Sequence, residues 1–333
     1  MTESRGRSAW VLVLVLPLLF FAAILIGRYG LRVDEAFRAL FGLDGAPGVL
    51  RSLILRVRLP RALAAACIGA NLAVCGAAFQ GLFRNPLVDS RILGISSGAA
   101  FGAALALLFS AGVAAVQGSA FAFALVAVGL VAVVGWRFGS STLVIVIGGI
   151  LVGALFNALL GLIKYVADPL SHLPAITYWL LGGLSGSRWA VLPPLLVITG
   201  LGLVFFLLIS WRLNLSTLSD GEATTLGVRI RPLRIAVIAV GTVMIAASVS
   251  IGGMIGWVGL VVPHVARAWV GPDHRVLIPT SAAIGASLLV VLDAISRTAL
   301  ASEIPLGILT GLIGVPTFFL LFLRFLRARG EAR

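Results

Sequence analysis

Long apolar runs separated by short polar segments constrain the fold of this sequence more than any other feature. About 20 apolar residues suffice to cross the ~30 Å hydrocarbon core of a membrane as a helix. A helix satisfies its own backbone hydrogen bonds, which a lipid environment requires. We therefore predict an all-α, polytopic membrane protein with ten transmembrane helices. The predicted spans are 10–27, 60–82, 92–110, 117–137, 141–166, 190–211, 234–251, 254–270, 276–296 and 305–326.

The composition agrees with this number of spans. Hydrophobic residues make up 60% of the 333 residues, which at ~20 residues per helix would fill about ten spans. Charged residues make up only 11%, against ~25% in soluble domains. An ordinary soluble enzyme is excluded, and we predict that residues 1–333 form a single transmembrane domain.

The net charge of +13 comes from 25 basic and 12 acidic residues. In a membrane protein, basic residues collect in cytoplasmic loops, so we place the N- and C-termini in the cytoplasm and expect no nucleic-acid partner. One segment departs from this rule, because it carries seven arginines on the predicted outer side: Arg28, Arg32, Arg38, Arg51, Arg56, Arg58 and Arg61. Either the topology differs here, or the outer surface is basic and meets an acidic partner.

No pattern of catalytic or cofactor-binding residues is found. The only lysine, Lys164, stands between Ile163 and Tyr165, so it cannot belong to a phosphate-binding P-loop. No cluster has metal-ligand spacing and no nucleophile-elbow motif occurs. We predict that the chain is not an enzyme and holds no cofactor, and that any ATP used for transport is bound by another chain.

Two polar loops are long enough to hold short helices. In the inner loop, 212–233, Ser219 and Glu222 have the spacing of a capping box, which predicts a helix over 220–226 that ends at Gly227. Such a helix lies outside the membrane and is a candidate docking element for a soluble partner. In the outer loop, 167–189, the stretch 174–181 predicts a short interfacial helix.

Polar residues within the spans are candidates for function because they are costly there. Asp293 and Arg297 are four residues apart and can neutralise each other, although Arg297 is equally suited to contact a partner. Asn157 is expected either to hydrogen-bond between helices or to line a path. Lys164 can reach the headgroups or line a vestibule.

Four blocks of sequence, in order, resemble the permease subunits of ATP-binding cassette (ABC) importers for iron chelates, heme and cobalamin. They are RLPR (58–61) with GANLAVCGAAFQGLFRNPLVDSRILGISSGAAFG (69–102), GGMIGWVGLVVPHVAR (252–267), GPDHRVLIPTSAAIGA (271–286) and EIPLGILTGLIGVPTFFLLF (303–322). The resemblance covers roughly residues 50–325, with Trp257 where the family usually has Phe. It implies a homodimer with ten helices per subunit in the bacterial inner membrane, two ATPase subunits on the cytoplasmic side, and a substrate-binding protein outside.

The resemblance also implies roles for particular residues. Arg58, Arg61 and Arg297 would receive acidic residues of the binding protein. The ATPase would contact the inner loop at Asp220, Gly221, Glu222, Ala223, Leu226 and Gly227. Asn157 and Lys164 are the candidates for the translocation path.

On this basis the function is import of a ferric siderophore or heme, with cobalamin as the alternative. An ion-coupled secondary transporter would need a titratable relay at membrane depth, for which Asp89 and Asp293 are the available candidates. A receptor without transport activity is a third possibility.

Overall fold

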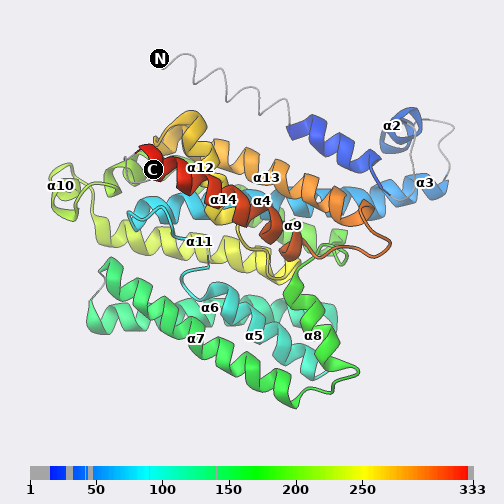
Figure 1. Cartoon of the computed structure of the whole chain (residues 1–333), viewed down its shortest axis with the longest axis horizontal. Coiled ribbons are helices and arrows are strands. Elements are labelled where there is room, and N and C mark those ends of the chain that lie inside the picture. Colours follow the sequence, from blue (N-terminus) through cyan, green and yellow to red (C-terminus); the bar gives the residue numbers. More distant parts are fainter. Residues whose placement is uncertain are drawn as a thin grey trace.

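The computed structural model describes residues 16–27, 33–41, 43, 48–89, 91–139 and 141–328, and within these ranges it contains helices and no strands. Most of the long helices run side by side in one elongated bundle (Figure 1). Besides a helical segment at Leu16–Leu25, the helices are α2 (Val33–Phe41), α3 (Gly48–Leu53), α4 (Leu59–Leu82), α5 (Ile95–Leu108), α6 (Val113–Phe138), α7 (Thr142–Val166), α8 (His172–Leu181), α9 (Leu192–Ser216), α10 (Asp220–Thr225), α11 (Ile230–Gly252), α12 (Val258–Val270), α13 (His274–Thr298) and α14 (Leu306–Ala328).

The all-α prediction is confirmed in the described residues. Six helical stretches are long and apolar enough to cross a membrane, and four shorter apolar helices coincide with the remaining predicted spans. Three of these, Leu16–Leu25, α5 with 14 residues and α12 with 13 residues, are shorter than the ~17–25 residues of a full span. The count of ten spans therefore stays a prediction, and residues 10–15 of the first span lie outside the described ranges.

Helix α4 forms the centre of the bundle and is buried almost from end to end. It packs against α9, α11, α12 and α13. Small residues make this possible: a Cβ added to Gly69 would overlap the carbonyl oxygen of Gly285 in α13, and one added to Gly76 would overlap that of Gly259 in α12. The helix backbones thus touch at these two crossings, which is the packing that small residues permit in membrane helices.

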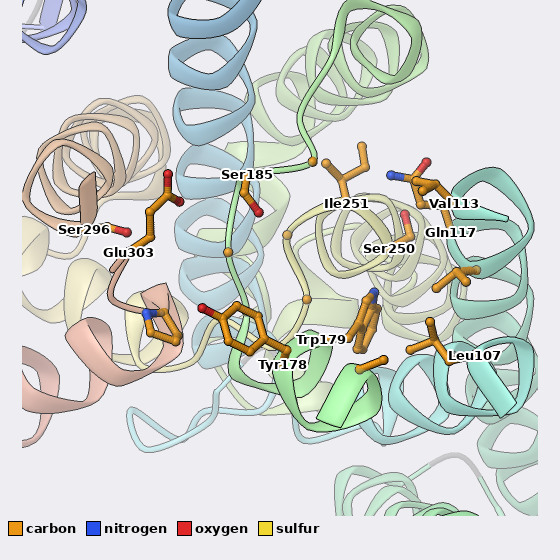
Figure 2. Close-up of a pocket in the computed structure, with 18 of the residues that line it drawn as sticks. Leu107, Val113, Gln117, Tyr178, Trp179, Ser185, Ser250, Ile251, Ser296 and Glu303 are labelled. Carbon is orange, nitrogen blue, oxygen red and sulfur yellow. The ribbon is translucent and has the colours of Figure 1, made fainter. Parts of the chain in front are cut away.

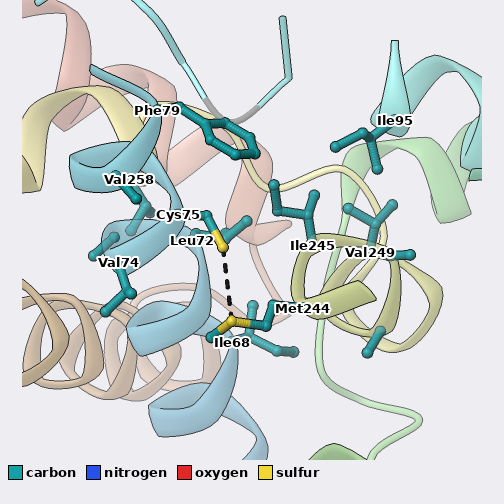
Figure 3. Packing of buried hydrophobic residues seen from close by; sticks show 14 of the residues in the cluster. Ile68, Leu72, Val74, Cys75, Phe79, Ile95, Met244, Ile245, Val249 and Val258 are labelled. Carbon is teal, nitrogen blue, oxygen red and sulfur yellow. Dashed lines mark hydrogen bonds between the residues drawn. The ribbon is translucent and has the colours of Figure 1, made fainter. Parts of the chain in front are cut away.

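The core between α4 and α11 is apolar, with a few polar groups within it (Figure 3). The Cys75 thiol lies 3.9 Å from the Met244 sulfur, and both cysteines of the chain are free and buried. Asn71 donates a hydrogen bond of 3.1 Å from Nδ2 to the Ser248 hydroxyl. This bond joins α4 to α11 through a buried polar pair.

Helices α5, α6 and α7 form a second group beside this core (Figure 1). Gly98 and Gly102 of α5 lie directly against the backbone of α6. Three phenylalanines, Phe101, Phe123 and Phe156, join the three helices with ring centroids 5.0–6.3 Å apart.

Two predicted helix starts are displaced in the structure. The span predicted from residue 60 is preceded by continuous helix from Gly48, because a π-turn at Ile54–Arg58 leads directly into α4. Pro60 lies where the π-helical segment passes into α4, so its missing N–H group leaves a carbonyl of the preceding turn without a helical donor. The Leu55 carbonyl in that turn accepts a hydrogen bond from the Trp189 indole instead, at 2.6 Å. The span predicted from residue 254 begins only at Val258, since Gly253 (φ 67°) and Trp257 (φ 68°) both have left-handed backbone conformations.

Candidate functional site

The two ends of α4 each carry a cluster of charged residues. Arg61 lies near its start, and Arg84 follows its end. The rise from Arg61 to Leu82 is about 32 Å at 1.5 Å per residue, close to the ~30 Å of a hydrocarbon core. The two clusters therefore face opposite membrane surfaces. We refer to them as the arginine end and the α10 end.

At the arginine end, Arg61 holds two carboxylates with three donors. Its Nε donates to Asp293 of α13 at 2.7 Å, while its two terminal nitrogens donate to the two oxygens of Glu303 at 2.9 Å. Arg61 is 5% exposed, whereas 39% of the Glu303 side chain is exposed. The pair with Asp293 is thus internal, and the pair with Glu303 borders the surface.

Arg58 and Arg297 complete this cluster. Arg58 donates to the carbonyl oxygens of Ile24 and Leu25 at 2.7 and 2.9 Å, and Arg297 donates to that of Ala23 at 3.0 Å. Both arginines therefore bind the C-terminal end of the first helical segment, where carbonyl groups lack helical partners. The predicted pairing of Arg297 with Asp293 is confirmed at 3.1 Å.

The structure thus brings Arg58, Arg61 and Arg297 together, and all three bind groups of this chain. Their predicted contact with acidic residues of a binding protein stays a prediction. Sequence reasoning missed Glu303, their acidic neighbour. The sequence offered one indication that Glu303 could be a site residue: it is the only carboxylate between Asp293 and Glu331 and stands directly before an apolar run.

Other arginines at this end are exposed. Three members of the seven-arginine segment, Arg38, Arg51 and Arg56, are exposed, while Arg28 and Arg32 lie outside the described residues. Arg188 is also exposed. It lies close to Arg56, because the indole of the adjacent Trp189 donates a hydrogen bond to the Leu55 carbonyl at 2.6 Å. The arginine end therefore has a basic surface around its buried cluster.

A hollow of about 330 Å³ opens near Glu303. Figure 2 shows Tyr178 and Trp179 of α8, Ser185 and Glu303 around it. Helix α8 confirms the short helix predicted in this loop. The chain makes two sharp turns beside the hollow, at Gly182 (φ 72°) and Gly253 (φ 67°), and Leu306 N–H at the start of α14 donates to the Gly182 carbonyl at 3.0 Å. The C-terminal ends of α8 and α11 and the N-terminal end of α14 therefore meet here.

At the α10 end, the predicted short helix is confirmed as α10, with its capping box. Ser219 donates its backbone N–H to Glu222 Oε2 at 2.9 Å, and Glu222 donates its own N–H to the Ser219 hydroxyl at 3.2 Å. The hydrogen bonds from the Ser219 hydroxyl and N–H lower the pKa of Glu222 below its ordinary value. Gly227 follows the helix with φ 84°.

One face of α10 is anchored and the rest is exposed. Ala223 is fully buried, whereas Gly221, Glu222, Leu226 and Gly227 are exposed. Asp220 forms ion pairs with Arg84, which follows α4, and with Arg234 of α11 at 3.5 Å. Arg84 also donates to the Ser216 carbonyl at the end of α9, at 3.0 Å. Helix α10 is thus tied to three long helices of the bundle and projects from it (Figure 1).

The two path candidates both lie on α7. Asn157 is exposed and Lys164 is half-buried. Within the described residues, Asn157 therefore does not join two helices by a hydrogen bond, whereas Asn71 does. The candidate relay carboxylates are already in ion pairs: Asp89 with Arg91 at 2.5 Å, and Asp293 with two arginines.

Comparisons with known proteins identify the class of the chain. The molybdate import permease MolB of Haemophilus influenzae is 38% identical over 329 residues, covering 98% of each chain. The hemin permease HmuU of Yersinia pestis is 36% identical, covering 96% of this chain and 98% of its own. A solved structure of a metal-chelate type ABC transporter, in an inward-facing conformation, superposes with a TM-score of 0.88 at 37% identity, covering 96% of this chain and 99% of that one.

The fold and these matches define a membrane transport permease rather than an enzyme. A family model matches residues 14–324. The chain belongs to the FecCD transport family.

Proposed function

We propose that this chain is the permease subunit of an ABC importer that takes up an iron chelate, either a ferric siderophore or heme. A substrate-binding protein delivers the cargo, and a separate ATPase drives transport. The chain acts as one permease domain in a homodimer in the bacterial inner membrane, with both termini in the cytoplasm. Membership of the FecCD transport family and relatives named for hemin and iron chelatin support this proposal, and a relative named for cobalamin keeps that cargo as the alternative.

The proposal rests mainly on the structure and anchoring of α10. It is a capped, projecting helix whose Asp220 is ion-paired to residues beside α4 and on α11. A soluble ATPase that moves α10 would therefore displace the long helices through these pairs. The exposed Gly221, Glu222, Leu226 and Gly227 provide its contact surface, and Ala223 fixes the helix to the bundle.

We further propose that the binding protein docks at the arginine end. The exposed Arg38, Arg51, Arg56 and Arg188 attract its acidic surface. Arg61 then exchanges Glu303, which borders the surface, for a carboxylate of the partner, while Asp293 stays bound. Because Glu303 also lines the hollow beneath, this exchange would change the entrance to the path.

The second copy is proposed to pack against the exposed face of α7. Asn157 lies on this face, together with the small residues Ala154, Ala158 and Gly161. Small residues allow helices to approach closely, and an amide in an apolar span finds its partner across such an interface. Asn157 and Lys164 would then border a path along the dimer axis.

Reconstitution tests this function directly. The full-length chain, its ATPase and its binding protein are placed in proteoliposomes, and uptake is measured for a ferric siderophore, heme, cobalamin and molybdate. Uptake of an iron chelate that requires ATP and resists a protonophore supports the proposal. Uptake that a protonophore abolishes would indicate an ion-coupled transporter, and molybdate as the preferred cargo would overturn the assignment of the substrate.

A further inference from the structure

A narrow crevice of about 290 Å³ opens between α6, α7 and α11, near the α10 end. Its wall is almost entirely apolar. The residues are Val128, Val131, Ala132, Gly135, Trp136, Ile145, Arg231, Arg234, Ile235, Ile238 and Ala239. There is open space beside Gly135, because a Cβ added to this residue would have its nearest neighbour, an Ile145 carbon, 3.9 Å away. The absence of a side chain at Gly135 therefore widens the crevice. The crevice is separate from the hollow at the arginine end and from the exposed surface of α10.

The charged groups of the crevice lie at one end only. Arg231 and Arg234 stand in the first turns of α11, and none of the residues that line the crevice is acidic. Arg234 forms an ion pair with Asp220, while Arg231 is exposed. A further exposed arginine, Arg137, directly follows the lining residue Trp136 in sequence. The mouth is therefore basic and the interior is apolar.

The depth of the crevice fits one leaflet of a membrane. From Arg231 to Ala239, α11 rises about 12 Å, most of the ~15 Å that is half of a hydrocarbon core. Trp136 is 79% exposed at the same end as the arginines, and tryptophan is enriched at the boundary between lipid and water. The basic mouth thus lies at headgroup level, with the apolar part directed toward the bilayer centre.

We propose that this crevice binds an anionic phospholipid of the leaflet next to α10. The phosphate lies at Arg231, with Arg234 behind it, and one acyl chain occupies the apolar wall from Trp136 to Ala239. Basic pockets between membrane helices recognise lipid headgroups in this way. A zwitterionic lipid would bring its own cation toward the arginines, which favours a lipid with net negative charge. This site goes beyond the proposed function and does not depend on the identity of the cargo.

Native mass spectrometry of the purified full-length chain tests the proposal. Dioleoyl phosphatidylglycerol and dioleoyl phosphatidylcholine carry the same acyl chains, so they separate the headgroup from the apolar contribution. Arg231→Gln removes the exposed charge and is compared with Arg229→Gln, which removes a nearby charge that does not line the crevice. Ala132→Phe fills the crevice and is compared with Ala122→Phe on the same helix, also at an exposed position but away from the wall.

We expect phosphatidylglycerol to be retained more strongly than phosphatidylcholine. Arg231→Gln should lower its retention roughly fivefold, which corresponds to the loss of one basic residue near an anionic lipid, while Arg229→Gln changes it less than twofold. Ala132→Phe should reduce retention of both lipids and Ala122→Phe of neither. Equal retention of the two lipids, unchanged binding in Arg231→Gln, or displacement of phosphatidylglycerol by millimolar inorganic phosphate would each overturn the proposal.

Discussion

The buried cluster at the arginine end allows a quantitative prediction. Arg61→Leu removes the donor at 2.7 Å from Asp293, whose side chain is only 2% exposed. Breaking a buried ion pair costs ~3–5 kcal/mol because a charge stays behind without its partner. Since Arg297 remains 3.1 Å from Asp293, the lower limit applies, and the half-exposed Glu303 pair adds at most ~1 kcal/mol. We expect a loss of about 3 kcal/mol in the free energy of unfolding.

Two further variants serve as controls for this prediction. Glu303→Gln, which leaves Asp293 paired, should cost about 1 kcal/mol or less. In the double variant Arg61→Leu/Asp293→Asn the buried carboxylate is removed together with its donor. Only the half-exposed Glu303 then loses Arg61, and Arg297 keeps its hydrogen bond to the Ala23 carbonyl, so about 2 kcal/mol should be recovered relative to Arg61→Leu. The assay is reversible unfolding of the purified protein in mixed detergent micelles. If Arg61→Leu costs no more than Glu303→Gln, or if the double variant is less stable than the single one, the reasoning about the cluster is refuted.

Three other predictions concern the α10 end and the core. Glu222→Lys should lower the coupling of ATP hydrolysis to transport, whereas Glu222→Gln, which preserves the capping geometry, should lower it less; equal coupling in both variants and the wild type, measured as cargo moved per ATP, would contradict a contact role for Glu222. Because hydrogen bonds from Ser219 lower the pKa of Glu222 in the folded state, their contribution to α10 is complete above the ordinary value of 4.5 and is lost as the pH falls through the lower, folded-state value. Protection of the 220–225 amides, measured as the exchange rate relative to that of the unfolded chain at the same pH, should therefore stay constant down to pH 4.5 and fall only below it. Loss of protection already near pH 6 would argue against the capping box. Gly76→Ala, whose Cβ would overlap the Gly259 carbonyl, should lower the free energy of unfolding by ~2 kcal/mol or more. Gly129→Ala, with open space around it, should be neutral or slightly stabilising. Similar stability of the two variants would show that α4 and α12 do not touch as described.

Sequence periodicity and length were sufficient for most of the fold. Apolar runs located every long helix because lipid exposure and burial both require apolar side chains, and Ser219 with Glu222 located α10 because capping is a local interaction. Local signals failed where tertiary contacts decide the backbone. Pro60 suggested a helix start, yet a π-turn continues the helix before it, and the left-handed Trp257 delays the start of α12.

The candidate site could be predicted only in part. The resemblance pointed to Arg58 and Arg61, which are three residues apart, and to Arg297, which is distant from both in sequence, and the structure places all three in one cluster. The partners of that cluster, Glu303 and the carbonyl groups of Ala23, Ile24 and Leu25, come from segments up to 274 positions away. No local pattern encodes such contacts. The crevice with Arg231 also needed the packing of three helices to be visible.

Helix α4 connects the two proposed contact surfaces. It is the most buried long helix among the described spans, and its backbone touches α12 and α13 through glycine crossings. Close packing of this kind transmits displacement, because a dense core has little free volume to absorb it. A movement of α10 through Asp220 and Arg84 would therefore reach Arg61 at the opposite end.

A separate ATPase, as proposed above, drives this permease through α10. Affinity purification of the tagged full-length chain from its native membranes in mild detergent, with quantification of co-purifying ATPase, tests it most directly. We expect one ATPase per permease chain for the wild type and a clear loss of ATPase for Glu222→Lys, with unchanged recovery for Arg229→Gln. A wild-type chain that purifies without ATPase in several detergents would contradict coupling through α10.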